Sequence, residues 1–166
     1  MAKSRFEAIV FGSSTLLDED GKLFPEAKRC FAELKAAGSE LAVAMTPVPE
    51  PGAVLAELMG ANAERFLDNL PAATPAVSGE SIELFSESHY YDVYASALET
   101  LRAWPAQTLV VESGMLGLDA ALRLRAGIFS MSDEGGPAAK HAAANGALGV
   151  AEPGDFAALL KITNKS

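Results

Sequence analysis

The chain has 166 residues, of which 49% are apolar, and it carries a formal net charge of −9. This length and apolar content predict a globular chain with one domain over residues 1–166, not a disordered one. The acidic excess argues against binding to the phosphate backbone of nucleic acids and against attraction to anionic membranes.

Strand-like apolar runs alternate with helix-like periods through the first half of the chain. Pro25 and Gly38 are residue types that commonly begin and end a helix, so they bracket the first predicted helix. The predicted elements are a strand at 6–11, a helix at 25–37, a strand at 41–45, a proline-rich turn at 46–52, a helix at 53–59 and irregular chain at 61–80.

The same alternation continues through the second half. The predicted elements are an edge strand at 82–85, a helix at 91–103, a strand at 108–111, a helix at 116–125, a strand at 127–131, a helix at 136–145, a strand at 148–150 and a helix at 155–162. This order predicts a three-layer α/β fold with a mainly parallel sheet between helices. The loops after residues 11, 45 and 111 then share one sheet edge, where ligands of such folds bind.

The single cysteine, Cys30, excludes an internal disulfide. No His or metal-ligand spacing surrounds it, so we predict a buried thiol and not a reactive one. The N-terminal residues lack the pattern of a secretion signal, and no apolar run is long enough to span a bilayer. A cytoplasmic protein is the resulting expectation.

The loop after the first strand, Gly12-Ser13-Ser14-Thr15, is small and rich in hydroxyl groups, and Leu-Leu-Asp follows it. This stretch resembles the first motif of the haloacid dehalogenase-like (HAD) hydrolases, an apolar strand followed by Asp-x-Asp-Gly-Thr. Gly12 stands at the position of the family's nucleophilic aspartate. Ser14 stands near the second aspartate, in a loop that is one residue short.

Three later segments resemble the remaining motifs of the same family. Thr46 follows the second strand, one residue after the position of the family's phosphoryl-binding hydroxyl. Ser88 occupies the position of the family's lysine, and Ser113 that of its magnesium-binding aspartate. The resemblance covers nearly the whole chain, and it implies a Rossmann-like HAD fold without a cap domain.

The family's reaction requires an aspartate that attacks phosphorus, a second carboxylate as acid, and Mg²⁺. This chain offers none of these groups at the matching positions, which are Gly12, Ser14, Thr46, Ser88 and Ser113. We therefore expect a HAD-like protein that has lost phosphohydrolase catalysis, needs no cofactor, and acts by binding a ligand or a protein partner.

A small anionic ligand is the first candidate for such binding, since hydroxyl groups and backbone amides beside a helix start attract anions. The alternative is that these residues form a polar turn without a ligand. The candidate binding residues are Gly12, Ser13, Ser14, Thr15, Thr46, Glu112, Ser113 and Gly114.

Two other functions remain open. One is an active phosphatase or hydrolase that uses relocated carboxylates, Asp18, Asp20 or Glu112, for Mg²⁺ and acid–base roles, although Asp20-Gly21 also favours a simple turn. The other is a structural or assembly subunit, in which an aromatic patch at 89–94 makes a homo-oligomer interface. Tyr90 and Tyr94 share a helix face in that patch, so packing onto the sheet is the competing interpretation.

Overall fold

In the computed structural model of the chain, residues 3–44, 72–73 and 87–164 are described. The strands are β1 (Ala8–Gly12), β2 (Glu40–Ala44), β3 (Ala72–Ala73), β4 (Thr108–Glu112), β5 (Gly127–Met131) and β6 (Gly149–Ala151). The helices are α1 (Pro25–Ala36), α4 (Glu87–Leu101), α5 (Met115–Leu124), α6 (Pro137–Ala144) and α7 (Phe156–Thr163), with short 3₁₀ helices η1 (Ser13–Leu16) and η3 (Pro105–Gln107).

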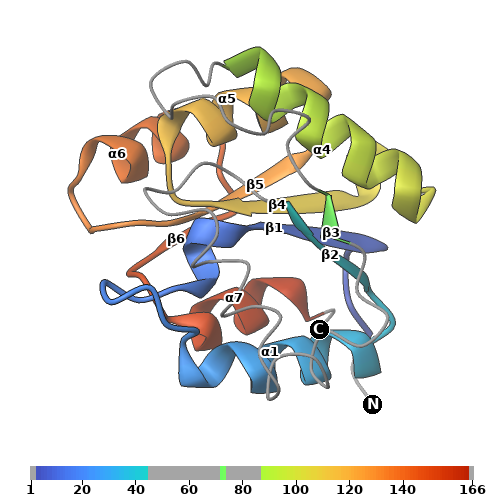
Figure 1. The fold of residues 1–166 in the computed structure, drawn as a ribbon, viewed down its shortest axis with the longest axis horizontal. Helices are drawn as coiled ribbons and strands as arrows, with labels where there is room; N and C mark the ends of the chain where they lie inside the picture. The colour runs from blue at the N-terminus through green and yellow to red at the C-terminus, as the bar shows by residue number, and fades with distance from the viewer. Residues whose placement is uncertain (1–2, 45–71, 74–86, 165–166) are drawn as a thin grey trace.

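The six strands form one parallel sheet in the order β3-β2-β1-β4-β5-β6. Helices α4, α5 and α6 cover one face of the sheet, and α1 and α7 cover the other (Figure 1). The predicted three-layer α/β fold with a parallel sheet is therefore confirmed. Within the described ranges, every helix and strand belongs to these layers and none forms a separate cap.

The alternation of side chains along β1 divides the core into two halves. Ile9 and Phe11 pack with α1 and α7, where Phe31 lies 4.6 Å from Phe11 between ring centroids. Val10 points to the opposite face and packs with residues of α4 and α5, including Tyr94. Because β1 is buried on both faces, its sequence is a continuous apolar run.

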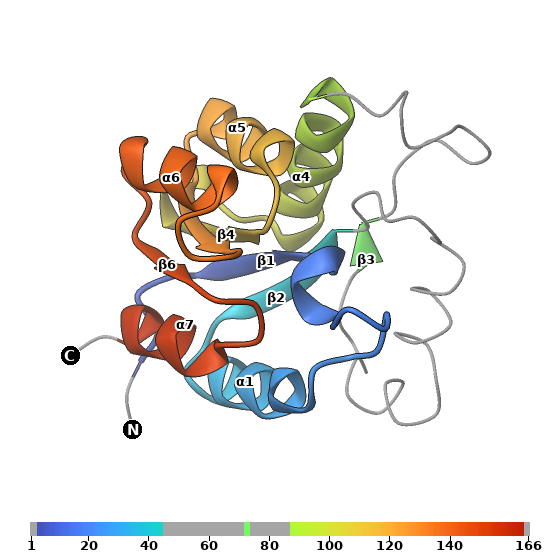
Figure 2. The same ribbon diagram turned by 90° about the vertical axis from the view of Figure 1, so that its left-hand side faces the viewer.

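The two chain ends that the structure describes lie side by side. Ser4 forms an isolated antiparallel bridge with Asn164, and the backbone N–H of Arg5 donates to the Thr163 carbonyl at 2.7 Å. Figure 2 shows both ends on the same side of the molecule. No helix among the described residues is long and apolar enough to cross a membrane.

Most predicted elements occur near their predicted bounds. Helix α4 begins at Glu87 and not at 91, because the polar residues before 91 carry no apolar period yet contain no residue that stops a helix. Strand β3 falls in the stretch that we predicted to be irregular, since two alanines are too short to form a pattern. The predicted helix at 53–59 and strand at 82–85 lie outside the described residues.

Arg125 ends α5 in the left-handed conformation, with φ 64° and ψ 32°. A side chain in this conformation is strained, whereas glycine adopts it freely. We expect Arg125→Gly to raise the free energy of unfolding by about 0.5–1 kcal/mol. Urea unfolding checks this result, with Arg125→Ala as the control that removes the charge but keeps Cβ. Equal stabilisation by both variants would assign the effect to the charge.

Cys30 lies in α1 with 1% of its surface exposed, as predicted. Burial, together with the charge of Glu33, raises the pKa of the thiol to about 12. The reactive thiolate is therefore scarce at neutral pH. We expect a disulfide reagent such as Ellman's reagent to leave native Cys30 unmodified and to react stoichiometrically once urea unfolds the chain. Rapid, complete reaction of the native protein would contradict this expectation.

Candidate functional site

Strands β1 and β4 are neighbours at the centre of the sheet, and they end side by side. Phe11 pairs with Val111, so the last residues of the two strands, Gly12 and Glu112, follow at adjacent positions. Val10 and Val110 both pack against the α4–α5 layer. Because side chains alternate, positions 12 and 112 face this same layer. The sheet thus brings Glu112 to the edge where we predicted ligand binding.

The Glu112 carboxylate is buried, with 2% of the residue exposed, and it is surrounded by hydrogen-bond donors. The Tyr94 hydroxyl of α4 donates to Oε2, and the backbone N–H of Ser113 donates to Oε1 at 2.9 Å. The backbone N–H of Gly114 and the hydroxyl of Ser14 lie close enough to this carboxylate to favour its charged form and to lower its pKa. A buried acidic group of this kind is stable only when such donors replace water.

Two glycines make room for Glu112. A Cβ atom on Gly12 would lie 2.7 Å from Glu112 Oε2. A Cβ atom on Gly117, in the first turn of α5, would overlap Cγ, Cδ and Oε2 of the same side chain. The carboxylate therefore occupies the space directly over Gly12, where any side chain at the end of β1 would begin. We call Gly12, Ser14, Tyr94, Glu112, Ser113 and Gly117 the strand-end site.

Burial sets the protonation of this site. It raises the pKa of Glu112 above its ordinary value, while the hydrogen bonds from Tyr94, Ser113, Gly114 and Ser14 oppose that rise. Burial and the nearby Glu112 charge raise the pKa of Tyr94 well above its usual value, so this phenol stays protonated and donates. The pKa of Tyr90 is raised by the same two causes.

Hydroxyl groups line the strand-end site on its half-buried side. Ser14 Oγ of η1 lies 2.8 Å from Ser113 Oγ, and this hydrogen bond joins the loops after β1 and β4. Thr15 Oγ1 donates to the carbonyl of Gly12 at 2.7 Å, so this hydroxyl stabilises η1. Ser13 is fully buried. Of the predicted binding residues, Gly12, Ser14, Glu112, Ser113 and Gly114 come together; Thr46 lies outside the described residues.

Asp18 and Asp20 lie in a turn after η1. The Asp18 carboxylate accepts from the backbone N–H groups of Asp20 and Lys22, each at 2.9 Å. Gly21 has φ +76° at this turn, and Leu17 pairs with Leu23 across it. The carboxylate of Asp18 thus caps a hairpin, as a turn-forming Asp-Gly pair favours. Within the described ranges, no three His, Cys, Asp or Glu side chains are grouped to hold a metal.

The aromatic patch of the sequence divides between the core and a helix contact. Tyr94 is fully buried against the sheet and belongs to the strand-end site. The guanidinium of Arg123 lies over the Tyr91 ring, 4.9 Å from its centroid, and links α5 to α4. Ser88 is exposed in the first turn of α4. Sequence reasoning missed the Tyr94–Glu112 contact, although period 3.6 on α4 does place Tyr94 on the sheet-facing side.

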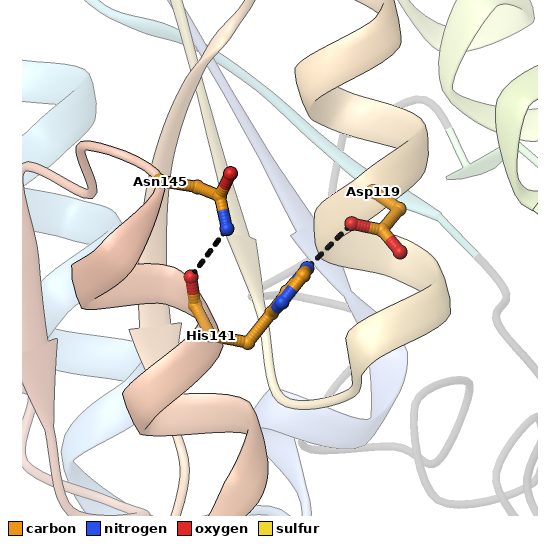
Figure 3. Close-up of polar contacts among 3 residues, drawn as sticks. All are labelled: Asp119, His141 and Asn145. Atoms are coloured by element: carbon orange, nitrogen blue, oxygen red, sulfur yellow. Dashed lines mark hydrogen bonds and ion pairs between the residues drawn. The ribbon is translucent and has the colours of Figure 1, made fainter.

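A second polar cluster joins α5 to α6. The His141 ring lies 2.6 Å from the Asp119 carboxylate, and Asn145 Nδ2 donates to the His141 carbonyl at 2.8 Å (Figure 3). The His141 and Asp119 side chains are partly buried between the two helices, whereas Asn145 is exposed. His141 is thus paired with Asp119 in the helix layer. Ser14 and Ser113 pair with each other in the strand-end site, and His141 is not their partner.

Comparisons with known proteins give a clear result for the fold. No protein-family model and no curated protein sequence matches this chain. Three similar solved structures are a provisionally assigned beta-phosphoglucomutase from Thermotoga maritima, a HAD family hydrolase from Deinococcus radiodurans R1 with bound phosphate and sodium, and CbbY from Rhodobacter sphaeroides in complex with phosphate.

These three structures match almost end to end. Their sequence identities are 16%, 17% and 19%, and their TM-scores are 0.68, 0.64 and 0.62, in the same order. The matches cover 93%, 96% and 93% of this chain and 98%, 97% and 96% of the other chains. This chain therefore has the fold of the HAD-like hydrolases.

Proposed function

We propose that this chain has lost the phosphohydrolase reaction of the HAD-like hydrolases that its sequence resembles and uses the same sheet edge to bind a ligand or a protein partner. The observation that carries the proposal is the Glu112 carboxylate directly over Gly12. A nucleophilic carboxylate on β1 would need this space. The carboxylate that fills it comes from β4 and is buried among donors, so its oxygens are committed to protein groups.

The open side of the site favours recognition of an anion. Ser14 and Ser113 offer half-buried hydroxyl groups, and Gly114 precedes the first turn of α5. The first amides of a helix lack partners within the helix and carry partial positive charge. Hydroxyl and amide donors together suit a phosphate or carboxylate group. We infer a small anionic ligand as the first candidate.

An activity screen tests the loss of catalysis. The purified chain is assayed with Mg²⁺ against a broad panel of phosphate esters, beside the variant Gly12→Asp/Ser113→Asp. Because an aspartate side chain introduced at position 12 would collide with Glu112, the decisive variant also carries Glu112→Ala. Silence of the natural chain supports the proposal, and activity gained only when Glu112 is removed identifies the obstruction. Robust Mg²⁺-dependent turnover by the natural chain would overturn the proposal.

A binding experiment tests the anion. Inorganic phosphate should raise the thermal unfolding midpoint in a concentration-dependent way, as any ligand that prefers the native state does. Ser14→Ala and Ser113→Ala should weaken this effect. Ser132→Ala is the matched control, because Ser130 and Ser132 form a similar hydroxyl pair at the end of β5, also at 2.8 Å. No shift with phosphate would refute the anionic ligand and leave the protein partner.

A further inference from the structure

We propose that β6 pairs in the antiparallel sense with β6 of a second copy of this chain, so that two molecules form a symmetric dimer with one continuous sheet. β6 is the last strand of the sheet, beyond β5. Figure 2 looks toward this edge, where β6 lies in front of the other strands, with α6 above it and α7 below it. This inference is independent of the proposed ligand, since it concerns the edge of the sheet and not the strand-end site.

The backbone of Val150, the middle residue of β6, faces outward. The Ser132 N–H donates to the Ala151 carbonyl at 3.0 Å, so Ala151 directs its hydrogen-bonding groups toward β5. Successive residues within a strand direct these groups to opposite sides. The N–H of Leu148 donates to the Ile128 carbonyl at 2.9 Å, but Leu148 precedes β6 and lies outside this alternation. Val150 therefore offers its N–H and its carbonyl to a strand that adds to this edge.

The side chain of Val150 is also open to a partner, with 40% of the residue exposed. Val150 pairs with Ser130 of β5, and Ile128, two positions earlier on β5, packs with the α4–α5 layer, so Val150 lies on this same face of the sheet. Lysine, proline and inward-pointing charges commonly protect an exposed edge from pairing, and the three residues of β6 include none of these.

The charges at the two ends of β6 favour an antiparallel partner. Glu152 directly follows the strand, and its carboxylate accepts from the backbone N–H of Glu134 at 2.8 Å, so two exposed acidic residues lie at the carboxyl end. At the opposite end of the sheet, Arg125 ends α5 just before β5, and Lys161 lies in the last turn of α7, which packs against β6. Both basic residues are exposed. In an antiparallel pair, the acidic end of each copy meets the basic end of the other.

A two-fold axis through the centre of β6 satisfies these features together. Val150 then lies opposite the partner's Val150, the two residues exchange two N–H···O bonds, and their side chains meet on one face of the joined sheet. The contact is isologous, so one surface supplies both halves of the charge complementarity. It is also small, because β6 has three residues. We therefore expect a weak, reversible dimer with a dissociation constant on the order of 0.1 mM.

Sedimentation velocity of the full chain, from about 1 µM to about 1 mM, measures this association. We expect a reversible monomer–dimer equilibrium. Val150→Lys should weaken it at least about tenfold, because a lysine on the edge opposes pairing. Trp104→Lys is the control, since Trp104 is 74% exposed but lies between α4 and β4, and it should leave the dimer unchanged. Urea unfolding verifies that both variants are folded. A chain that stays monomeric at about 1 mM, or a dimer that Val150→Lys does not weaken more than Trp104→Lys does, would overturn the proposal.

Cysteine cross-linking tests the pairing itself. In a pair centred on Val150, the two Cα atoms of residue 150 lie about 5.5 Å apart, a separation that suits a disulfide. The two copies of residue 148 lie about 13 Å apart along the strands. Val150→Cys should therefore form a disulfide-linked dimer under mild oxidation. Leu148→Cys should not, although Leu148 is 42% exposed, and the native thiol of Cys30 is buried. Equal cross-linking of the two variants, or none with Val150→Cys, would refute the β6 pair.

Discussion

Substituting alanine for Gly117 is expected to lower the free energy of unfolding by about 3 kcal/mol. The added methyl group would overlap Cγ, Cδ and Oε2 of Glu112, in a buried part of α5 that packs against the sheet. Glu112 cannot move aside without leaving the donors that replace water around its carboxylate. Equilibrium unfolding in urea measures the loss.

A neighbouring glycine provides the control. A Cβ atom on Gly114 meets no atom within 4 Å, so Gly114→Ala should cost less than about 1 kcal/mol. Glu112→Ala should relieve the overlap in the Gly117→Ala background, so the double variant should be more stable than the sum of the two single losses predicts. Strict additivity would show that Gly117 is needed for a reason other than Glu112.

Replacing Glu112 with glutamine is expected to destabilise the protein by about 2 kcal/mol and to remove a pH dependence of its stability. The amide keeps the shape of the carboxylate. Its NH₂ group, however, must face either the backbone N–H of Ser113, which can only donate, or the Tyr94 hydroxyl, which would have to change from donor to acceptor. In either orientation one hydrogen bond to a charged carboxylate oxygen, from Tyr94 or from Ser113, is lost.

The pH dependence has a definite sign. Burial raises the pKa of Glu112 in the folded chain above its value in the unfolded chain. Between these two pKa values the native state binds more protons, so the stability contributed by Glu112 is present at acid pH and falls as pH rises through the interval. The difference in unfolding free energy between the natural chain and Glu112→Gln should shrink accordingly. Urea unfolding from acid to neutral pH measures it, and a difference that widens with pH would contradict the expectation.

Local signals account for the parts of the fold that were predictable from the amino-acid sequence. Pro25 and Gly38 bracket α1, and Asp155 caps α7 by accepting from the backbone N–H of Ala158 at 3.2 Å. The continuous apolar run of β1 predicts a strand that is covered on both faces. Each of these signals depends only on residues that are close in the sequence, so each can be recognised without knowing the tertiary structure.

The strand-end site was only partly predictable, because its contacts depend on register across the sheet. The loops of Ser14 and Ser113 were expected at one edge, and they lie there. Glu112 fills the space over Gly12 for two reasons. The register between β1 and β4 places the two residues side by side, and Gly117 of α5 leaves room for the carboxylate on the same face of the sheet. Neither fact has a signal in the neighbouring residues. The two glycines, at the end of β1 and in the first turn of α5, are the only sequence trace of the carboxylate between them.

The pairing of β1 with β4 also has a consequence for how the chain folds. Val10 pairs with Val110, so this contact closes a loop of 110 − 10 = 100 residues. The elements from β4 to β6 follow one another closely in the chain, as do β1, α1 and β2. One half, β1 to β2, therefore meets the other half, β4 to β6, along the β1–β4 pair, which we call the seam. Contacts that close such long loops form slowly.

Ser14 and Gly12 lie on one side of this seam, and Ser113 and Glu112 lie on the other. The site consequently cannot exist in either half alone. It is completed only when the halves dock, and backbone amides along the seam should exchange their hydrogens only through global unfolding. In this chain, completing the site and completing the fold are one event.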